Sequence, residues 1–461
     1  VTGSVTNQAD VVIDAADSVL VDAFDASDVS DDEGGAYIAA WADNDIYSGS
    51  VTADITGSVI NDASVDITTG EDVEITAGNN ASAYIEAQAY NELDDISENT
   101  LDVAVGGDVT NTSDVTIDAE GDVELYAWDD SESWIWANAE NDIEGNVGIE
   151  VTGSIDNTAT VLVEAADDVL VEAEENSESG IYAWAENGDD NIADIQITTE
   201  DSSVGDDDFD GLLVSSMDAE ALIDAQARDA SNSNSATIAI DVVGGDVVVE
   251  DYGYYYDSAE ITAEAEGAGQ SNTADVTVNA TAISKTITEV DLTIINGGNV
   301  EVDAEEGGHA QILARARGAG GKEDPEMDPS SNTANVTVNA TGAEVTESVL
   351  VEEGGYGPDD SPIDPVYEDI TYTEGGNVIV TAENSSEAEI QAVTESSAAN
   401  YSNVLICADG EVEVRDENSM LSTAKILSSA KYGLINDAYT GVRGAEGISV
   451  LGYGGACFNS F

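Results

Sequence analysis

The sequence predicts an all-β protein whose repeated strands wind into a right-handed parallel β-helix, or β-solenoid. Three observations support this fold class: apolar residues fall at every second position over long stretches, one pattern recurs without gaps, and only 5 prolines occur in 461 residues. A period of two is that of a strand with one buried face. A recurring pattern is the mark of a repeat architecture, in which one structural unit is used many times.

The repeat pattern first spans residues 7–23, where apolar and polar residues alternate. It returns at 61–77, 111–127 and 157–173 with no insertion inside it, although the copies start 54, 50 and 46 residues apart. Short turns such as Asp17-Ser18 and Gly121-Asp122 divide each copy into two predicted strands. Variation in length is therefore confined to loops outside the pattern.

Two further strands are predicted in each unit. The third has Ile, Ala and Ala at its inward positions, as in residues 85–89, and aromatic residues at outward positions. The fourth covers residues 51–55, 101–105 and 147–151, and a glycine then leads into the next unit. Four short strands in about 50 residues predict about 25 residues for each coil of the β-helix.

Tandem β-sandwich domains of about 100 residues are the alternative architecture. Sandwich cores normally contain larger residues, whereas the inward positions here are small and the tryptophans fall on the outward phase.

The chain divides into three regions: regular repeats at 1–200, more variable repeats at 201–416, and a less acidic segment at 417–461. We interpret the last segment as a cap or a subunit-joining segment. Two inserts in the middle region, 322–329 and 354–369, are expected to be acidic surface loops.

The run from Asn111 to Ala127 has the form Asn-Thr-x-x-Val-x-Ile-x-Ala-x-Gly-Asp-Val-x-Leu-x-Ala. This pattern resembles the strand repeats of large secreted filamentous-haemagglutinin-like proteins. The resemblance implies a secreted protein at the cell surface, with an adhesive or filamentous role.

Charge is the most extreme property of the chain, because 98 Asp and Glu face only 9 Lys and Arg, for a formal net charge of -89. Such a surface repels nucleic acid phosphates and anionic lipids, so both are excluded as partners. No apolar run is long enough for insertion into a membrane. Because mutual repulsion opposes compaction, the fold needs cations, supplied by bound Ca²⁺ or by a salty medium.

Asp206, Asp208 and Asp210 are the candidate Ca²⁺ ligands. The spacing Asp-x-Asp-x-Asp-Gly places three carboxylates around one point, and Gly211 permits a sharp turn. The loop is not an EF-hand, because Met217 stands where the closing glutamate would be. The alternative is a chance triplet in a very acidic chain.

The outward aromatic residues of the third strands are candidate contacts to another subunit or to a sugar, since exposed tryptophan rows are costly unless they are covered. Burial under loops or a neighbouring sheet is the alternative. These residues are Tyr37, Trp41, Tyr84, Trp134, Trp136, Tyr182 and Trp184.

Seven Asn-x-Ser/Thr sequons are candidate glycosylation acceptors, although chance alone produces such triplets in a chain rich in Asn, Ser and Thr. The two cysteines, Cys407 and Cys457, either pair or remain buried thiols. The sequon asparagines are Asn80, Asn111, Asn279, Asn335, Asn339, Asn384 and Asn400.

Three functions are compatible with these features. The leading hypothesis is a structural extracellular protein that forms a homopolymer: a subunit or segment of a cell-surface filament, sheath or matrix polymer stabilised by cations. The first alternative is an adhesin stalk that binds cell-surface glycans or another surface ligand.

The second alternative is a β-helix enzyme that degrades polysaccharides, with His309, Arg315 and Arg317 as its basic residues. The acidic surroundings of these residues disfavour a cleft for an anionic substrate. No nucleophile–base pair or zinc constellation is evident in the sequence. We therefore expect no enzymatic activity.

Overall fold

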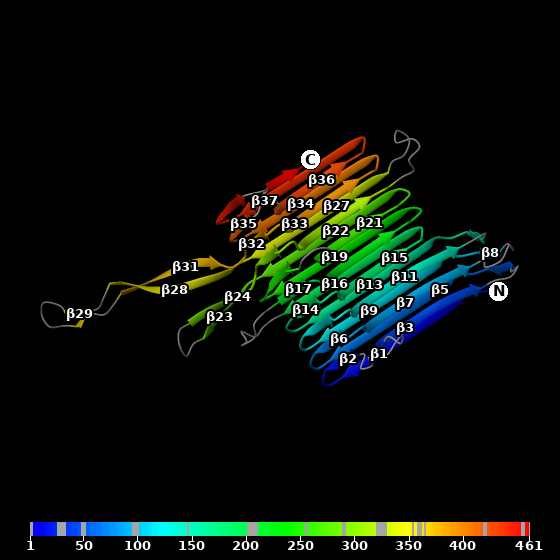
Figure 1. Cartoon of the computed structure of the whole chain (residues 1–461), viewed down its shortest axis with the longest axis horizontal. Helices are drawn as coiled ribbons and strands as arrows, with labels where there is room; N and C mark the ends of the chain where they lie inside the picture. The colour runs from blue at the N-terminus through cyan, green and yellow to red at the C-terminus, as the bar shows by residue number, and fades with distance from the viewer. Residues whose placement is uncertain are drawn as a thin grey trace.

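The fold is that of a computed structural model of the whole chain (Figure 1). The structure describes residues 3–24, 34–47, 52–94, 101–144, 147–200, 211–253, 257–287, 292–319, 330–352, 355–356, 362–363, 366–417, 422–452 and 457–460.

Three ten-stranded parallel sheets form one continuous stack of coils (Figure 1). Sheet A contains, in spatial order, β1 (Val5–Ala15), β5 (Val59–Thr69), β9 (Val109–Ala119), β13 (Ile155–Ala165), β16 (Asp190–Glu200), β19 (Ser233–Val243), β22 (Ser271–Thr281), β27 (Ser331–Thr341), β34 (Ala399–Ala408) and β37 (Ile435–Gly444).

Sheet B contains β2 (Val19–Phe24), β6 (Val73–Gly78), β10 (Val123–Trp128), β14 (Val169–Glu174), β17 (Gly211–Met217), β20 (Asp246–Asp251), β25 (Val300–Ala304), β32 (Val378–Glu383), β35 (Glu411–Glu417) and β38 (Gly447–Gly452). Sheet C contains β3 (Gly34–Tyr47), β7 (Ala81–Asp94), β11 (Glu132–Glu144), β15 (Glu178–Glu186), β18 (Glu220–Arg228), β21 (Ser258–Glu266), β26 (His309–Arg317), β33 (Glu387–Glu395), β36 (Thr423–Lys431) and β39 (Cys457–Ser460). Each coil contributes one strand to each sheet, so coil 1 is β1, β2 and β3, and coil 10 is β37, β38 and β39.

The expected parallel β-helix is confirmed, since every neighbouring pair within these three sheets is parallel. The expected coil length of about 25 residues is wrong. Asn7 pairs with Asn61 and Asn61 with Asn111, so partners are identical positions of successive repeats. Four strands per repeat were expected to form two coils of two strands each. Instead, three strands of each repeat line the core, one in each sheet, so one coil takes the whole repeat.

The core follows the period of two that the sequence shows. On sheet A, Val65 and Ile67 point inward and are almost completely buried, and on sheet C the same holds for Ile85, Ala87 and Ala89. Side chains as small as Ala and Val let three sheets approach one another closely.

The fourth predicted strand is confirmed in coils 1 to 3. It forms β4 (Thr52–Ile55), β8 (Leu101–Val105) and β12 (Val147–Val151), which pair in a separate three-stranded parallel sheet. Val59, Val105 and Val109 form a small second core there. Coil 4 lacks this strand, because only Asn187, Gly188 and Asp189 connect β15 to β16.

Antiparallel hairpins extend away from the stack in coils 7 and 8 (Figure 1). They pair β23 (Ile283–Ile287) with β24 (Leu292–Asn296), β28 (Ala343–Glu352) with β31 (Val366–Glu374), and β29 (Gly355–Tyr356) with β30 (Pro362–Ile363). The insert at 354–369 is therefore partly a hairpin rather than only a loop, because its flanks pair with each other. The insert at 322–329 lies outside the described residues.

A column of asparagines runs through the whole stack on the inward side of sheet A. In coils 1 to 9 the Nδ2 of this asparagine donates a hydrogen bond to the Oδ1 of its counterpart in the next coil, over 2.8 to 3.3 Å. The counterparts are 34 to 68 residues apart in the sequence. We call this column the asparagine ladder: Asn7, Asn61, Asn111, Asn157, Asn191, Asn234, Asn272, Asn332, Asn400 and Asn436.

The asparagine ladder makes further hydrogen bonds within each coil. In coils 1 to 3 a second column, Asn44, Asn91 and Asn141 on sheet C, bonds to it from the side. Further along, the ladder amides donate to backbone carbonyls at the end of each sheet C strand, as Asn332 does to Glu395 O at 2.6 Å. Buried amides are tolerated only when paired in this way.

The described residues of the three ranges 1–200, 201–416 and 417–461, which differ in composition, all contribute strands to the same stack of coils. Glu200 ends a strand within coil 5, and residues 423–460 contribute β36 and then all of coil 10. None of the described residues lies in a helix long and apolar enough to cross a membrane.

We expect Val115→Asp to destabilise the fold by several kcal/mol, because Val115 is completely buried and an unpaired carboxylate there is strongly disfavoured. Its neighbour Thr116 points outward, so Thr116→Asp should change the free energy of unfolding by about 0.5 kcal/mol. Denaturant unfolding followed by circular dichroism measures both. Equal losses would contradict the assignment of the inward face.

Replacing Asn111 by alanine should cost about 3 kcal/mol or more, since it removes the completely buried hydrogen bonds that Asn111 makes with Asn61, Asn91 and Asn157 and with the carbonyl of Glu140. The matched control is Asn339→Ala on the outer face of sheet A, where one bond to Asn279 at 2.8 Å is lost. We expect about 1 kcal/mol there. The same unfolding measurement compares the two variants.

Candidate functional site

The outward aromatic residues predicted from the sequence lie together on the outer face of sheet C, in coils 1 to 4. The parallel register places Tyr37, Tyr84 and Trp134 in one row across the strands, and Trp136 beside Tyr182 in the next row. Trp41 and Trp184 lie at equivalent positions on β3 and β15. Their outward orientation is confirmed; we call this group the sheet C aromatic patch.

The rings of the patch contact one another across coils. Trp134 lies 5.7 Å from Tyr84, 5.8 Å from Trp136 and 5.4 Å from Tyr182, measured between ring centroids. The ring of Tyr182 occupies the space beside Gly180, where a Cβ atom would be 2.4 Å from it. These rings bury one another, while Tyr37 and Trp41 at the coil 1 end are 64% and 55% exposed.

Carboxylates accept hydrogen bonds from the polar ends of several rings. Tyr84 donates to Glu132 at 2.8 Å, Tyr182 to Glu178 at 2.7 Å, and Trp184 to Glu186 at 2.8 Å. Burial raises the pKa of Glu178 despite its hydrogen bond from Tyr182. The indole nitrogens of Trp134 and Trp136 are buried without an acceptor, so the centre of the patch is packed for apolar contact.

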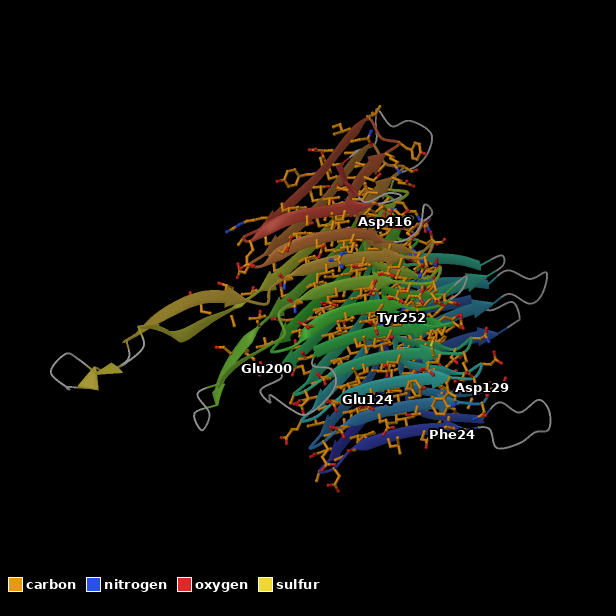
Figure 2. The ribbon with its side chains drawn as sticks, turned by 60° about the vertical axis from the view of Figure 1, so that its left-hand side comes forward. Phe24, Glu124, Asp129, Glu200, Tyr252 and Asp416 are labelled. Atoms are coloured by element: carbon orange, nitrogen blue, oxygen red, sulfur yellow. The ribbon has the colours of Figure 1, made fainter. Side chains whose placement is uncertain are left out.

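A second aromatic group, on the outer face of sheet B, was not singled out in the sequence. Trp128 lies 5.2 Å from Phe24 and 4.9 Å from Tyr126, and its ring covers Gly78 between them. A groove beside these rings also contains Glu74, Glu124 and Glu172. Phe24 and Glu124 mark it in Figure 2.

The signal for this sheet B groove was present in the sequence. Tyr126 and Trp128 sit on the outward phase of the second strand of the repeat pattern. Burial, followed by repulsion from Asp122 and Glu74, raises the pKa of Glu124. Burial and a hydrogen bond to Glu174 raise the pKa of Tyr126 to about 12.

Basic residues take over the outer face of sheet C in the later coils. Glu264, 6% exposed, has Arg317 at 2.9 Å, Arg228 at 3.5 Å and Arg315 at 3.8 Å. Arg317 also pairs with Glu266 at 2.7 Å.

Two other contacts complete this cluster. Arg228 stacks over Trp184 at 4.7 Å, which joins the basic cluster to the sheet C aromatic patch. His309, one of the basic residues considered for catalysis, is half-buried with its Nδ1 3.8 Å from Glu387. Arg315 and Arg317 thus engage carboxylates of their own chain.

Asp224 lies between the aromatic and basic parts of this face. It accepts a hydrogen bond from Gln226, while its Oδ1 is buried without a donor. Burial raises the pKa of Asp224 to about 7, with Glu264 and Glu260 adding to the shift and Arg228 opposing it. On sheet B, burial and the charges of Glu305 and Glu383 raise the pKa of Asp303 to about 7.

Asp206, Asp208 and Asp210 lie outside the described residues. Within the described ranges, no group of three or more His, Cys, Asp or Glu side chains is arranged to hold a metal ion.

The structure separates the seven sequons. Asn111 and Asn400 are completely buried in the asparagine ladder, so the prediction that they accept glycans is wrong for the folded chain. Asn80 and Asn384 are exposed in turns between sheets B and C. Asn279, Asn335 and Asn339 are half-buried on the outer face of sheet A, where their side chains take part in hydrogen bonds along the stack.

Cys407 is a free thiol on the outward phase of sheet A, so a bond to Cys457 is not formed. The strand that carries Cys457 belongs to sheet C.

No family model, curated protein or solved structure matches this chain.

We expect the melting temperature to be higher at pH 5 than at pH 8. An unfolded aspartate has a pKa of about 3.9, whereas folding raises the pKa of Asp224 and of Asp303 to about 7. The folded chain therefore binds more protons than the unfolded chain between these values, and its stability falls as pH rises through this range.

The variant Asp224→Asn, which keeps the side chain uncharged, should flatten part of this pH dependence in a thermal melt. The exposed Asp66 on sheet A provides the control substitution Asp66→Asn. If both variants keep the full pH dependence, Asp224 is not a source of it.

Proposed function

We propose that the chain is a structural extracellular protein, a subunit or segment of a cell-surface filament, sheath or matrix polymer stabilised by cations. The observation that carries the proposal is the unbroken stack of coils held along its whole length by the asparagine ladder. Such a stack is a stiff rod, because each coil contacts mainly its neighbours and every contact repeats along one axis. Strands of similar length joined by connections of variable length suit a spacer better than a protein built around a binding pocket.

The charge of the rod supports a role for cations in this structure. Glu74 and Glu124 are register partners on the outer face of sheet B, one strand spacing apart. Two like charges about 4 Å apart repel by about 1 kcal/mol even in bulk water. Cations between such rows would convert repulsion into cohesion, both within a rod and between rods. We propose Ca²⁺ as one such ion, with Asp206, Asp208 and Asp210 as its ligands.

An adhesin stalk that binds glycans is the second candidate, and the aromatic groups favour it. Trp128, Tyr126 and Phe24 line a groove together with carboxylates, an arrangement that stacks on a sugar ring and accepts bonds from its hydroxyls. The two candidates differ in what covers the rings: another rod for the polymer, or a saccharide for the stalk.

Electron microscopy of the purified chain, combined with thermal melting, tests the proposal. In low salt with Ca²⁺ we expect ordered assemblies, and a chelator should shorten them and lower the melting temperature. If monovalent salt near 1 M, which screens charges beyond about 3 Å, alone restores the melting temperature after chelation, a salty medium explains the acidity better than specific Ca²⁺ sites.

Two results would decide against parts of the proposal. If the chelator changes neither assembly nor melting in low salt, Ca²⁺ ligation is contradicted. If the chain forms only isolated rods in every condition and is retained on a column of immobilised saccharide, the stalk is supported and the polymer is rejected. The variant Trp128→Ala, compared with Trp184→Ala on the other face, locates any saccharide bound.

A further inference from the structure

The sheet B groove owes its shape to two small residues of coil 2. Gly78 lies between Phe24 of coil 1 and Trp128 of coil 3 in one row across the strands. A Cβ atom at Gly78 would be 2.5 Å from the Trp128 ring, so the missing side chain lets this ring reach across coil 2 to Phe24. In the next row, the short Thr76 lies beside Tyr126. The groove has a volume of about 390 Å³, within the range of sites for small molecules.

Carboxylates share this groove with the aromatic rings, and no basic residue accompanies them. Glu74 and Glu124 are register partners on β6 and β10, and Glu172 follows on β14. Within the described ranges, none of these three carboxylates is paired with a Lys, Arg or His side chain. The sequence has no Lys or Arg before Arg228, and its one histidine is His309, so the first four coils contain no basic side chain. The groove therefore combines negative charge with rings that attract cations.

The same combination of groups holds an arginine on sheet C. The guanidinium of Arg228 lies 4.7 Å from the centre of the Trp184 ring and 3.5 Å from Glu264. An aromatic ring and a carboxylate thus bind one cation between them, because the electron-rich ring and the negative charge both favour it. In the sheet B groove the rings and the carboxylates are present, and a ligand can supply the cation.

The electrostatics of the groove favour a ligand that carries both a cation and hydroxyl groups. Burial, followed by repulsion from Asp122 and Glu74, raises the pKa of Glu124. A neutral ligand would leave this repulsion in place, whereas a cation would oppose it. An ammonium group has only three hydrogens to donate, fewer than the carboxylates of the groove can accept. Hydroxyl groups on the same ligand would donate to the remaining oxygens, which a simple amine cannot do.

We propose that the sheet B groove binds an amino sugar whose amine is unacetylated and protonated. The sugar ring packs against Trp128 and Tyr126, and the ammonium group lies among the three carboxylates. This inference rests on the second candidate function, the stalk that binds glycans, and names the class of saccharide. N-acetylation removes the positive charge, so the acetylated sugar should bind more weakly.

Isothermal titration calorimetry of the full chain with the glucosamine disaccharide tests the inference. Salt at about 0.15 M screens attraction to the rest of the acidic rod, and a chelator keeps Ca²⁺ out of the comparison. The N-acetylated disaccharide provides the ring without the charge, and putrescine, a linear diamine, provides the charge without the ring. We expect the glucosamine disaccharide to bind about tenfold more tightly than either, the effect of one cation–π contact or one charge-assisted hydrogen bond.

Two variants and a matched control locate the site. Trp128→Ala and Glu124→Gln should each weaken binding of the glucosamine disaccharide about tenfold. The control is Glu301→Gln, because Glu301 lies in the same outward row of sheet B as Glu124 but in coil 7, outside the groove. It should leave binding unchanged. Circular dichroism verifies that each variant keeps its strands.

Three results would overturn the inference: equal binding of the acetylated disaccharide, equal binding of putrescine, or equal losses in Glu124→Gln and Glu301→Gln. The first result would leave a glycan-binding stalk standing, with a site for neutral sugars. The second and third would show that amines bind the acidic rod without a specific site. If no saccharide binds, the inference and the stalk are both rejected, while the polymer, which microscopy tests, is unaffected.

Discussion

The asparagine ladder is the interaction on which the register of the whole stack depends. The apolar alternation alone cannot set register, because a slip of two residues between coils keeps every apolar side chain inward. Such a slip would move Asn111 away from Asn61 and Asn157 and place its amide against apolar side chains. Buried amides without partners are costly. The inward asparagine of each coil therefore excludes the shifted registers that the apolar side chains alone would permit.

The ladder also explains how the repeats vary so widely in length while the rod stays regular. Asn157 and Asn191 are 34 residues apart, and Asn332 and Asn400 are 68 apart, yet both pairs make the same bond. The additional residues of the longer repeat lie in the hairpin of β28 and β31, outside the stack. Because lengthening a surface connection adds little closure entropy, such arms cost the rod little stability.

Much of this fold could be predicted from the sequence, because the period of two is a local signal. The strand positions and the inward phase of Val115, Ile117 and Ala119 follow from alternation alone, and the structure confirms them. The coil length was wrong because it depends on how many sheets close around the core, which pairing between distant strands decides. The asparagine of the repeat pattern was visible, and it lies in the same phase as the apolar residues after it. Its role depends on a partner in another coil, so it was instead considered as a sequon at Asn111 and Asn400.

The candidate surfaces show the same division between local and distant signals. Outward tryptophans such as Trp134 were predictable from phase, whereas the cluster around Glu264 joins Arg228 of coil 5 to Arg315 and Arg317 of coil 7. These arginines are neighbours only because the register stacks β18, β21 and β26. The result is a rod whose outer sheet C face changes from aromatic to ionic along its axis, with Trp184 and Arg228 in contact at the boundary. A rod with such an axial difference has distinct sides and distinct ends, so any assembly it forms inherits a direction from the order of the repeats in the chain.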